Sequence, residues 1–141
     1  MDLAPALNII KQFEGCKLKA YQDIVGVWTI GFGSTANVSP GEVITIDEAL
    51  KRLNDDVAVR ANKVQKLVTA DCTNNQLCAL VSLSYNIGLG NLTHSTLLKL
   101  LNERADVHQV ADEFLKWDKA GGQVVAGLLR RRQAERSLFL S

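Results

Sequence analysis

Residues 13–33 read FEGCKLKAYQDIVGVWTIGFG, and the fold can be worked out from this stretch outward. Glu14 and Gly15 end an apolar pattern with helical spacing, and glycine is the usual residue just beyond a helix C-terminus. β-branched and aromatic residues then lie between glycines, which is typical of a twisted hairpin. Asp23 falls at the turn of this hairpin and Thr29 on its second strand. The stretch therefore predicts a helix followed directly by a small antiparallel sheet.

The flanking segments predict a mostly helical molecule. Residues 4–13 form a short amphipathic pattern, and capping signals mark later helix starts, because a Thr or Asp side chain can satisfy the free amides of a first turn. The expected starts are Thr45 with Glu48, Thr73 with Gln76, and Asp106 with Gln109; short and final helices are expected over STLLKLLN (95–102) and GLLRRRQAERSLFL (127–140). Gly88, Gly90 and the AGG run at 120–122 are expected to interrupt the helices.

This order of elements indicates an α+β fold in which the strands are segregated near the front. One helix and one small sheet are followed by about five helices. We expect a single domain over residues 1–141, with a β lobe at about 15–45 and a larger helical lobe at about 46–141 that includes the N-terminal helix. A groove between two such lobes is a common place for a site.

Composition excludes some functions. The chain has 141 residues and a formal net charge of +1, which gives no overall field toward nucleic acid or membranes. Charge is nevertheless uneven: residues 1–50 hold three lysines and six acids, and residues 114–141 hold six basic residues and two acids. We favour an internal match between these segments; contact of the tail with an anionic polymer is the alternative. No apolar run could span a membrane, and the N-terminus has no basic signal-peptide start.

The three cysteines do not indicate a metal site. Cys16, Cys72 and Cys78 lack the spacing of zinc ligands, and only His94 and His108 could complete a set. We expect reduced thiols. A disulfide formed after export stays open, because the sequence cannot pair three cysteines.

Glu14 and Asp23 are predicted to occupy unlike environments, as the two carboxyls of glycosidic cleavage do. A helix-end carboxyl with apolar neighbours can hold a proton and act as general acid, whereas an Asp in a wet turn stays ionised. The ionised partner can stabilise the sugar cation, bind the attacking water or attack the sugar. Thr29 offers a hydroxyl that can orient such a water. The spacing is also compatible with purely structural roles, since Asp is common in turns and Thr in strands.

The same residues closely resemble the signature of phage-type lysozymes, the muramidase endolysins. The matching positions are Glu14-Gly15, Leu18, Ala20-Tyr21, Asp23, Gly26, Thr29-Ile30-Gly31, Phe32 and Gly33. The resemblance continues through LVSLSYNIGLGNLTHSTLLKLLN (80–102), WDKAGG (117–122) and GLLRRRQAERSLFL (127–140). It therefore covers almost the whole chain in order.

The resemblance implies a lysozyme-like fold with saccharide bound between the two lobes. It implies that Glu14 is the acid, that Asp23 is its partner and that Thr29 completes a catalytic triad. The implied substrate is peptidoglycan, cut at the β-1,4 bond between N-acetylmuramic acid and N-acetylglucosamine. Water attack with inversion is expected. No cofactor and no metal are expected.

The resemblance also implies supporting residues. An arginine of the last helix should approach Glu14, with Arg132 as the preferred candidate and Arg131 as the second; the alternative is that this arginine run is a solvated face. Their positions within the matching sequence blocks imply that five further residues face the groove: Phe32, Gly33, Ser95, Thr96 and Gln123. Ser34 stands where many relatives carry His, so a local ion pair found in some of them should be missing.

Partners and location follow from the same resemblance. Peptidoglycan is the expected partner, and a holin is the expected functional partner that opens the inner membrane. We expect a monomer without nucleic acid and without a stable membrane anchor, held in the host cytoplasm until release and acting on the wall in the periplasm. Host and wall chemotype stay open.

Three alternatives remain at this stage. A lytic transglycosylase would act on the same bond with one acid and no water. A wall-binding protein could keep the fold without the chemistry. The basic, apolar segment 127–141 could disrupt membranes.

Overall fold

The computed structural model describes all 141 residues and contains helices and two short hairpins. The elements are α1 (Ala4–Glu14), β1 (Lys17–Gln22), β2 (Trp28–Gly31), α2 (Ile46–Leu67), α3 (Asn74–Ile87), α4 (Leu89–Thr93), α5 (Thr96–Asn102), α6 (Val107–Glu113), a 3₁₀ turn η1 (Phe114–Lys116), β3 (Lys119–Ala120), β4 (Gln123–Val124) and α7 (Ala126–Leu140). The predicted α+β class is confirmed.

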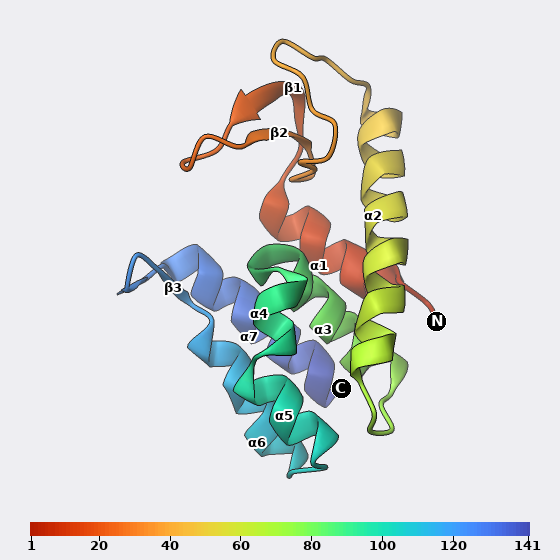
Figure 1. Cartoon of the computed structure of the whole chain (residues 1–141), viewed down its shortest axis with the longest axis vertical. Helices are drawn as coiled ribbons and strands as arrows, with labels where there is room; N and C mark the ends of the chain where they lie inside the picture. Colours follow the sequence, from red (N-terminus) through yellow and green to blue (C-terminus); the bar gives the residue numbers. More distant parts are fainter.

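The elements form two lobes (Figure 1). Strands β1 and β2, with the loop that leads to α2, make the β lobe at one end of the molecule. The remaining helices gather at the other end, and the long helix α2 runs beside both lobes. Strands β1 and β2 are antiparallel, with Tyr21 opposite Thr29 and Gln22 opposite Trp28.

Helix α3 is the centre of the helical lobe. It packs against α1, α2 and α7, and its residues from Cys78 to Ser84 are all buried. A helix that is buried on every side needs apolar residues all round, which explains the nearly uninterrupted apolar run in this segment. Its start is fixed by a complete capping box between Thr73 and Gln76.

The other predicted caps also form. Thr45 accepts from the backbone amide of Glu48 at 3.2 Å, and Asp106 caps α6. Ser95, which was not predicted as a cap, caps α5. Gly15 ends α1 with a φ of +66°, a conformation that glycine adopts without strain.

Two glycine predictions need correction. Gly88 ends α3 as expected, but Gly90 lies inside the short helix α4. The AGG run does not simply break the chain, because Gly121 and Gly122 both have positive φ and form the turn of a second hairpin, β3–β4. A two-residue turn with positive φ at both positions matches the natural twist of a hairpin.

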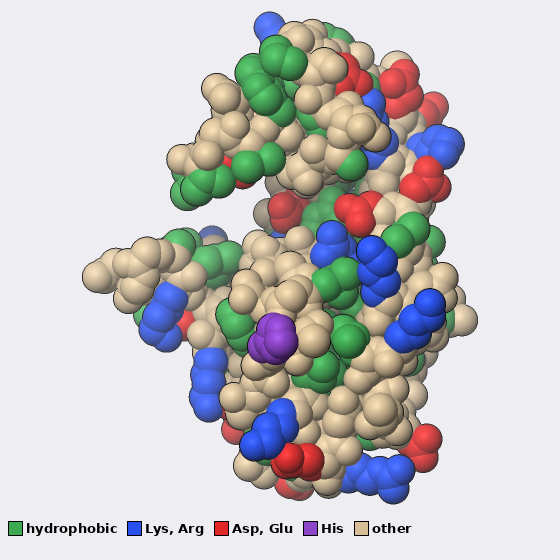
Figure 2. Space-filling model, in the orientation of Figure 1, with side chains coloured by type: hydrophobic (Ala, Val, Ile, Leu, Met, Phe, Trp, Pro, Cys, Tyr) green, Lys and Arg blue, Asp and Glu red, His purple; other side chains and the backbone are tan.

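A hollow separates the two lobes on the face seen in Figure 2. The β1–β2 turn on one side of the molecule carries exposed aliphatic side chains, since Ile24 is 100% and Val25 is 78% exposed.

None of the helices is both long enough and apolar enough to cross a bilayer.

Candidate active site

Glu14 is the last residue of α1 and lies where the chain turns from the helical lobe into the β lobe. Its side chain is 22% exposed, so the carboxyl is accessible without being free in solvent. A pocket of about 560 Å³ reaches it between the end of α1 and the start of α7. The helix end thus presents one carboxyl to an open space between two elements.

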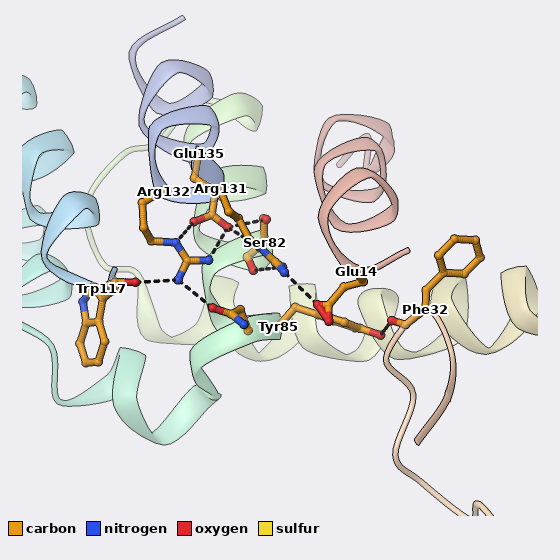
Figure 3. Close-up of polar contacts among 9 residues, drawn as sticks. Glu14, Phe32, Ser82, Tyr85, Trp117, Arg131, Arg132 and Glu135 are labelled. Carbon is orange, nitrogen blue, oxygen red and sulfur yellow. Dashed lines mark hydrogen bonds and ion pairs between the residues drawn. The ribbon is translucent and has the colours of Figure 1, made fainter. Parts of the chain in front are cut away.

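Arg131 of α7 is the charged partner of Glu14 (Figure 3). Its Nη1 donates to Glu14 Oε2 at 2.9 Å, across 117 positions of sequence. The preference for Arg132 is therefore corrected in favour of Arg131, the second candidate. The neighbour that meets the carboxyl is a guanidinium and not the apolar surface expected from the sequence.

The arginine run of α7 is not a solvated face. Arg131 and Arg132 are buried, with 3% and 0% exposure, and only Arg130 is exposed. Successive helical residues differ by about 100° in direction, so the two buried guanidinium groups point to different partners. Arg132 Nη1 donates to Asn86 Oδ1 at 2.9 Å rather than to Glu14.

Gly33 is packed directly against the Glu14 carboxyl. A Cβ atom at Gly33 would lie 2.8 Å from Glu14 Oε1, closer than real Cβ contacts allow, and its φ is +81°. Arg131 therefore holds one carboxyl oxygen while the backbone of Gly33 limits the position of the other. Only glycine leaves this space.

Asp23 and Thr29 are tied together through the backbone of Val27. The Val27 amide donates to Asp23 Oδ1 at 2.9 Å, and the Thr29 hydroxyl donates to the Val27 carbonyl at 3.0 Å. The Val25 amide also donates to Asp23 Oδ1, at 3.0 Å. The turn thus uses one oxygen of Asp23 and leaves Oδ2 without a donor from the protein, and Thr29 keeps its oxygen lone pairs available.

The Tyr21 phenol lies within electrostatic range of both the Glu14 and the Asp23 carboxyl. Burial raises the pKa of its phenol, and the negative charges of Glu14 and Asp23 raise the pKa further. Tyr21 faces Thr29 across the hairpin, and side chains of directly opposed residues lie on the same face of a sheet. Tyr21 is therefore within electrostatic range of Glu14 and Asp23 and lies opposite Thr29.

The predicted groove residues divide into two groups. The Phe32 ring is 7% exposed and belongs to the core, and only its carbonyl is directed elsewhere, accepting from Tyr85 at 2.7 Å. Ser95 is 5% exposed, and its hydroxyl serves the α5 cap. Thr96 and Gln123 are exposed, on α5 and β4. The Phe32 and Ser95 side chains are therefore buried, whereas those of Thr96 and Gln123 reach the surface.

The sequence matches a family model described as phage lysozyme over residues 11–135. The chain belongs to the phage lysozyme family. This span includes the helix-end Glu14, the hairpin with Asp23 and Thr29, and the arginine of α7 that contacts Glu14. The resemblance inferred from the sequence is therefore confirmed.

Individual relatives support the same assignment. An endolysin of Bacillus phage B103 is 46% identical over 100% of this chain, and one of Acyrthosiphon pisum secondary endosymbiont phage 1 is 43% identical over 96% of this chain and 94% of its own length. The chain spans only about half the length of some relatives, 55% for the phage B103 protein and 53% for the endolysin of Bacillus phage PZA.

A solved structure confirms the lysozyme-like fold. The muramidase domain of SpmX from Asticaccaulis excentricus superposes with a TM-score of 0.90 at 36% identity, covering 98% of this chain and 96% of that domain. Within this phage lysozyme chain, no group of three or more His, Cys, Asp and Glu side chains could hold a metal ion, and all three cysteines are free.

Three residues that support the site were not predicted from the sequence. Tyr85 of α3 holds the Phe32 carbonyl, while Ser82 of α3 and Glu135 of α7 contact Arg131. Glu135 had a readable signal, because it stands four positions after Arg131, a spacing that allows an ion pair on a helix. Ser82 had none, since a Ser in an apolar run is compatible with simple burial.

Proposed function

We propose that this chain is a lysozyme-type glycoside hydrolase that cuts peptidoglycan at the β-1,4 bond between N-acetylmuramic acid and N-acetylglucosamine. The observation that carries the proposal is a helix-end carboxyl held by a buried arginine beside a pocket of about 560 Å³, followed directly by a hairpin that carries Asp23 and Thr29. Membership of the phage lysozyme family supports it.

Glu14 is proposed as the general acid. Arg131 fixes Oε2 and leaves Oε1, beside Gly33, as the oxygen that can carry a proton toward the substrate. That proton passes to the glycosidic oxygen as the bond from this oxygen to the anomeric carbon breaks. The leaving sugar departs as an alcohol, and Glu14 is left as a carboxylate beside the guanidinium.

Asp23 and Thr29 are proposed to hold the attacking water. Asp23 Oδ2 has no donor from the protein, and the Thr29 hydroxyl already uses its hydrogen on the Val27 carbonyl. Both oxygens are therefore acceptors, which suits the two hydrogens of one water molecule. As the water oxygen bonds to the anomeric carbon, one of its protons passes to Asp23. Attack by water opposite the leaving group gives inversion.

The proposed saccharide path runs between the lobes. Gly33 borders the acid, and the exposed side chains of Thr96 and Gln123 on the helical side are proposed contacts. We further propose that residues 1–141 act as one catalytic domain, as a monomer, in phage-driven lysis of a bacterial host. In this scheme the protein waits in the host cytoplasm until a holin opens the inner membrane, and then acts on the wall in the periplasm.

Clearing of outer-membrane-permeabilised Gram-negative cells tests the proposal. The parent should clear the cells, Glu14→Gln should lose nearly all of this activity, and Glu103→Gln, at an exposed position, should behave like the parent. Circular dichroism checks that all three proteins fold. Equal clearing by parent and Glu14→Gln would remove Glu14 from the mechanism and direct attention to the basic segment 127–141.

Analysis of the products separates the possible reactions. New reducing ends of inverted anomeric configuration, read by NMR, are expected. A product mixture dominated by 1,6-anhydro muropeptides would instead identify a lytic transglycosylase. Retained configuration at the anomeric carbon would contradict water attack from the Asp23 side.

A further inference from the structure

Glu135 is a buried carboxyl that the proposed reaction does not use. It is 0% exposed, in the middle of α7, between the two arginines that precede it and helix α3. An isolated carboxylate in such a position would be strongly unfavourable, so its partners determine what it does.

Two arginines and one serine converge on Glu135 (Figure 3). Ser82 of α3 donates to Oε2 at 2.5 Å, and Arg131 Nε and Arg132 Nη2 donate to the same oxygen at 3.3 Å. Arg132 Nε lies 2.7 Å from Oε1, an ion pair without hydrogen-bond geometry. The pKa of Glu135 is raised, because burial outweighs the charges of Arg132 and Arg131 and the hydrogen bond from Ser82, which act in the opposite direction.

All three nitrogens of the Arg131 guanidinium are engaged. Nε contacts Glu135, Nη2 donates to the Ser82 carbonyl at 3.0 Å, and Nη1 donates to Glu14. The guanidinium is planar and rigid, so fixing two of its nitrogens fixes the direction of the third. The orientation of the bond to Glu14 is therefore determined inside the protein, by Glu135 and Ser82.

The local charges balance. Glu14 and Glu135 are the acids of this cluster, and Arg131 and Arg132 are the bases. The groups that bond to it from other elements are neutral: Ser82 and Asn86 on α3 and the Trp117 carbonyl after η1. Nearer to Glu14 lie the Tyr21 and Tyr85 phenols, and the charges of Asp23, Asp56 and Arg60 act on these phenols. Among the other charges of α6 and α7, Asp112 pairs with Arg136, Glu113 pairs with Lys116, and Arg130 lines the same pocket as Glu14.

We propose that Glu135 is a positioning residue for the general acid: it aims Arg131 at Glu14 and offsets one positive charge, so that Glu14 can hold a proton during the reaction. This inference rests on the proposed function. Without the charge of Glu135, the cluster carries an extra positive charge close to Glu14, and that charge favours loss of the proton.

The test compares Glu135→Gln with the parent in kcat and KM across a pH series, using release of reducing ends from soluble peptidoglycan fragments. The amide keeps the shape but removes the charge. The pH above which kcat falls should move down by about one unit, because an extra positive charge near a carboxyl lowers its pKa by about that amount or more. KM should change little. A merely structural loss would lower kcat equally at every pH.

A matched control is available in Glu113. It is also buried, at 6% exposure, but it pairs with Lys116 and has no contact with Arg131 or Glu14. Glu113→Gln should leave the pH profile unchanged. The variant with both Arg132→Met and Glu135→Gln removes one charge of each sign, and its pH profile should return toward that of the parent.

Glu135→Asp covers the case in which Glu135→Gln does not fold. It keeps the charge but shortens the reach to Arg131, so kcat should fall about tenfold or more, from misplacement of the acid, at an unchanged pH profile and KM. A folded Glu135→Gln with the parent's pH profile, or a Glu135→Asp with the parent's kcat, overturns the inference while the proposed function stands. A parent that hydrolyses no glycan overturns both.

Discussion

Gly33 shows how much the site depends on single residues that carry no chemistry. Block position identified Gly33 as a groove residue, but the sequence held no sign that its α-carbon borders the Glu14 carboxyl. Such a contact joins residues from two elements and becomes visible only when both are placed. The same limit explains why Arg131 and Arg132 were ranked in the wrong order, since the exact rotation of α7 decides which of two adjacent arginines reaches α1.

Gly33→Ala is expected to lower hydrolysis by at least about tenfold, because a Cβ would displace Oε1 of Glu14, the proposed general acid, and misplacement of a catalytic group is costly. Gly41→Ala is the control. It has nearly the same positive φ, +79° against +81°, but no atom within 4 Å of a new Cβ. Both variants should lose about 1 kcal/mol or more of stability from backbone strain, measured by urea unfolding. Equal activity of the two would contradict the role of Gly33.

Asp23→Asn should abolish most hydrolysis with little loss of stability. The amide keeps an oxygen that can accept from the Val25 and Val27 amides, but it cannot take a proton from water. Loss of a general base, the role proposed for Asp23, typically costs about 10²–10⁴ in rate. Thr29→Val should also lose activity, whereas Thr29→Ser, which keeps the hydroxyl, should retain most of it. Initial rates and thermal unfolding of the three variants check this pattern.

At the scale of elements, most helix starts were predictable because their signals are local. A cap needs only one side chain and the amides two or three positions later, so Thr73 and Asp106 could be read directly from the sequence. The second hairpin was not predicted, because strands of two residues each are too short to show any periodicity. Burial of the α7 arginines was not predicted either, since it depends on partners contributed by α3 and α1.

Thr73→Ala should destabilise the protein by about 1 kcal/mol without changing hydrolysis at 25 °C, because it removes one half of the capping box of the central helix. Thr93→Ala is a matched control. The Thr93 hydroxyl only donates to the Leu89 carbonyl within α4, so its loss should cost less than about 0.5 kcal/mol. Urea unfolding of both variants measures the difference, and comparable losses would show that the cap contributes little.

At the scale of the whole molecule, the two-lobe arrangement was predictable from the order of elements, but the contacts that join the lobes were not. Tyr85 is the main example. It stands on α3, its hydroxyl donates to the Phe32 carbonyl in the β lobe, and Arg60 of α2 lies 5.2 Å from its ring centre. Three parts of the chain therefore meet at one phenol. Its ring also borders Gly33, since a Cβ atom at Gly33 would lie 3.7 Å from Tyr85 Cε1. The sequence SLSYNIG indicates only a buried helix, because none of these partners is close in sequence.

This tyrosine should make stability depend on pH in the alkaline range. Burial, followed by the charges of Asp56 and Glu14, raises the pKa of Tyr85 from 10.0 to about 12. The folded state therefore keeps the proton where the unfolded state has lost it. The stabilisation is fully present below about pH 10 and disappears as pH rises through about 12, a loss of roughly 2–3 kcal/mol.

Tyr85→Phe should remove this pH dependence. At neutral pH the variant should be about 1 kcal/mol less stable, because the bond to the Phe32 carbonyl is lost. Between pH 10 and 12 the parent should lose this advantage and become the less stable of the two, because the loss of roughly 2–3 kcal/mol exceeds it. Titration of exposed groups is common to both proteins and cancels in the difference. Urea unfolding of both proteins at several pH values measures that difference. A constant gap between them up to pH 12 would mean that Tyr85 gives up its proton as easily in the folded protein as in the unfolded chain.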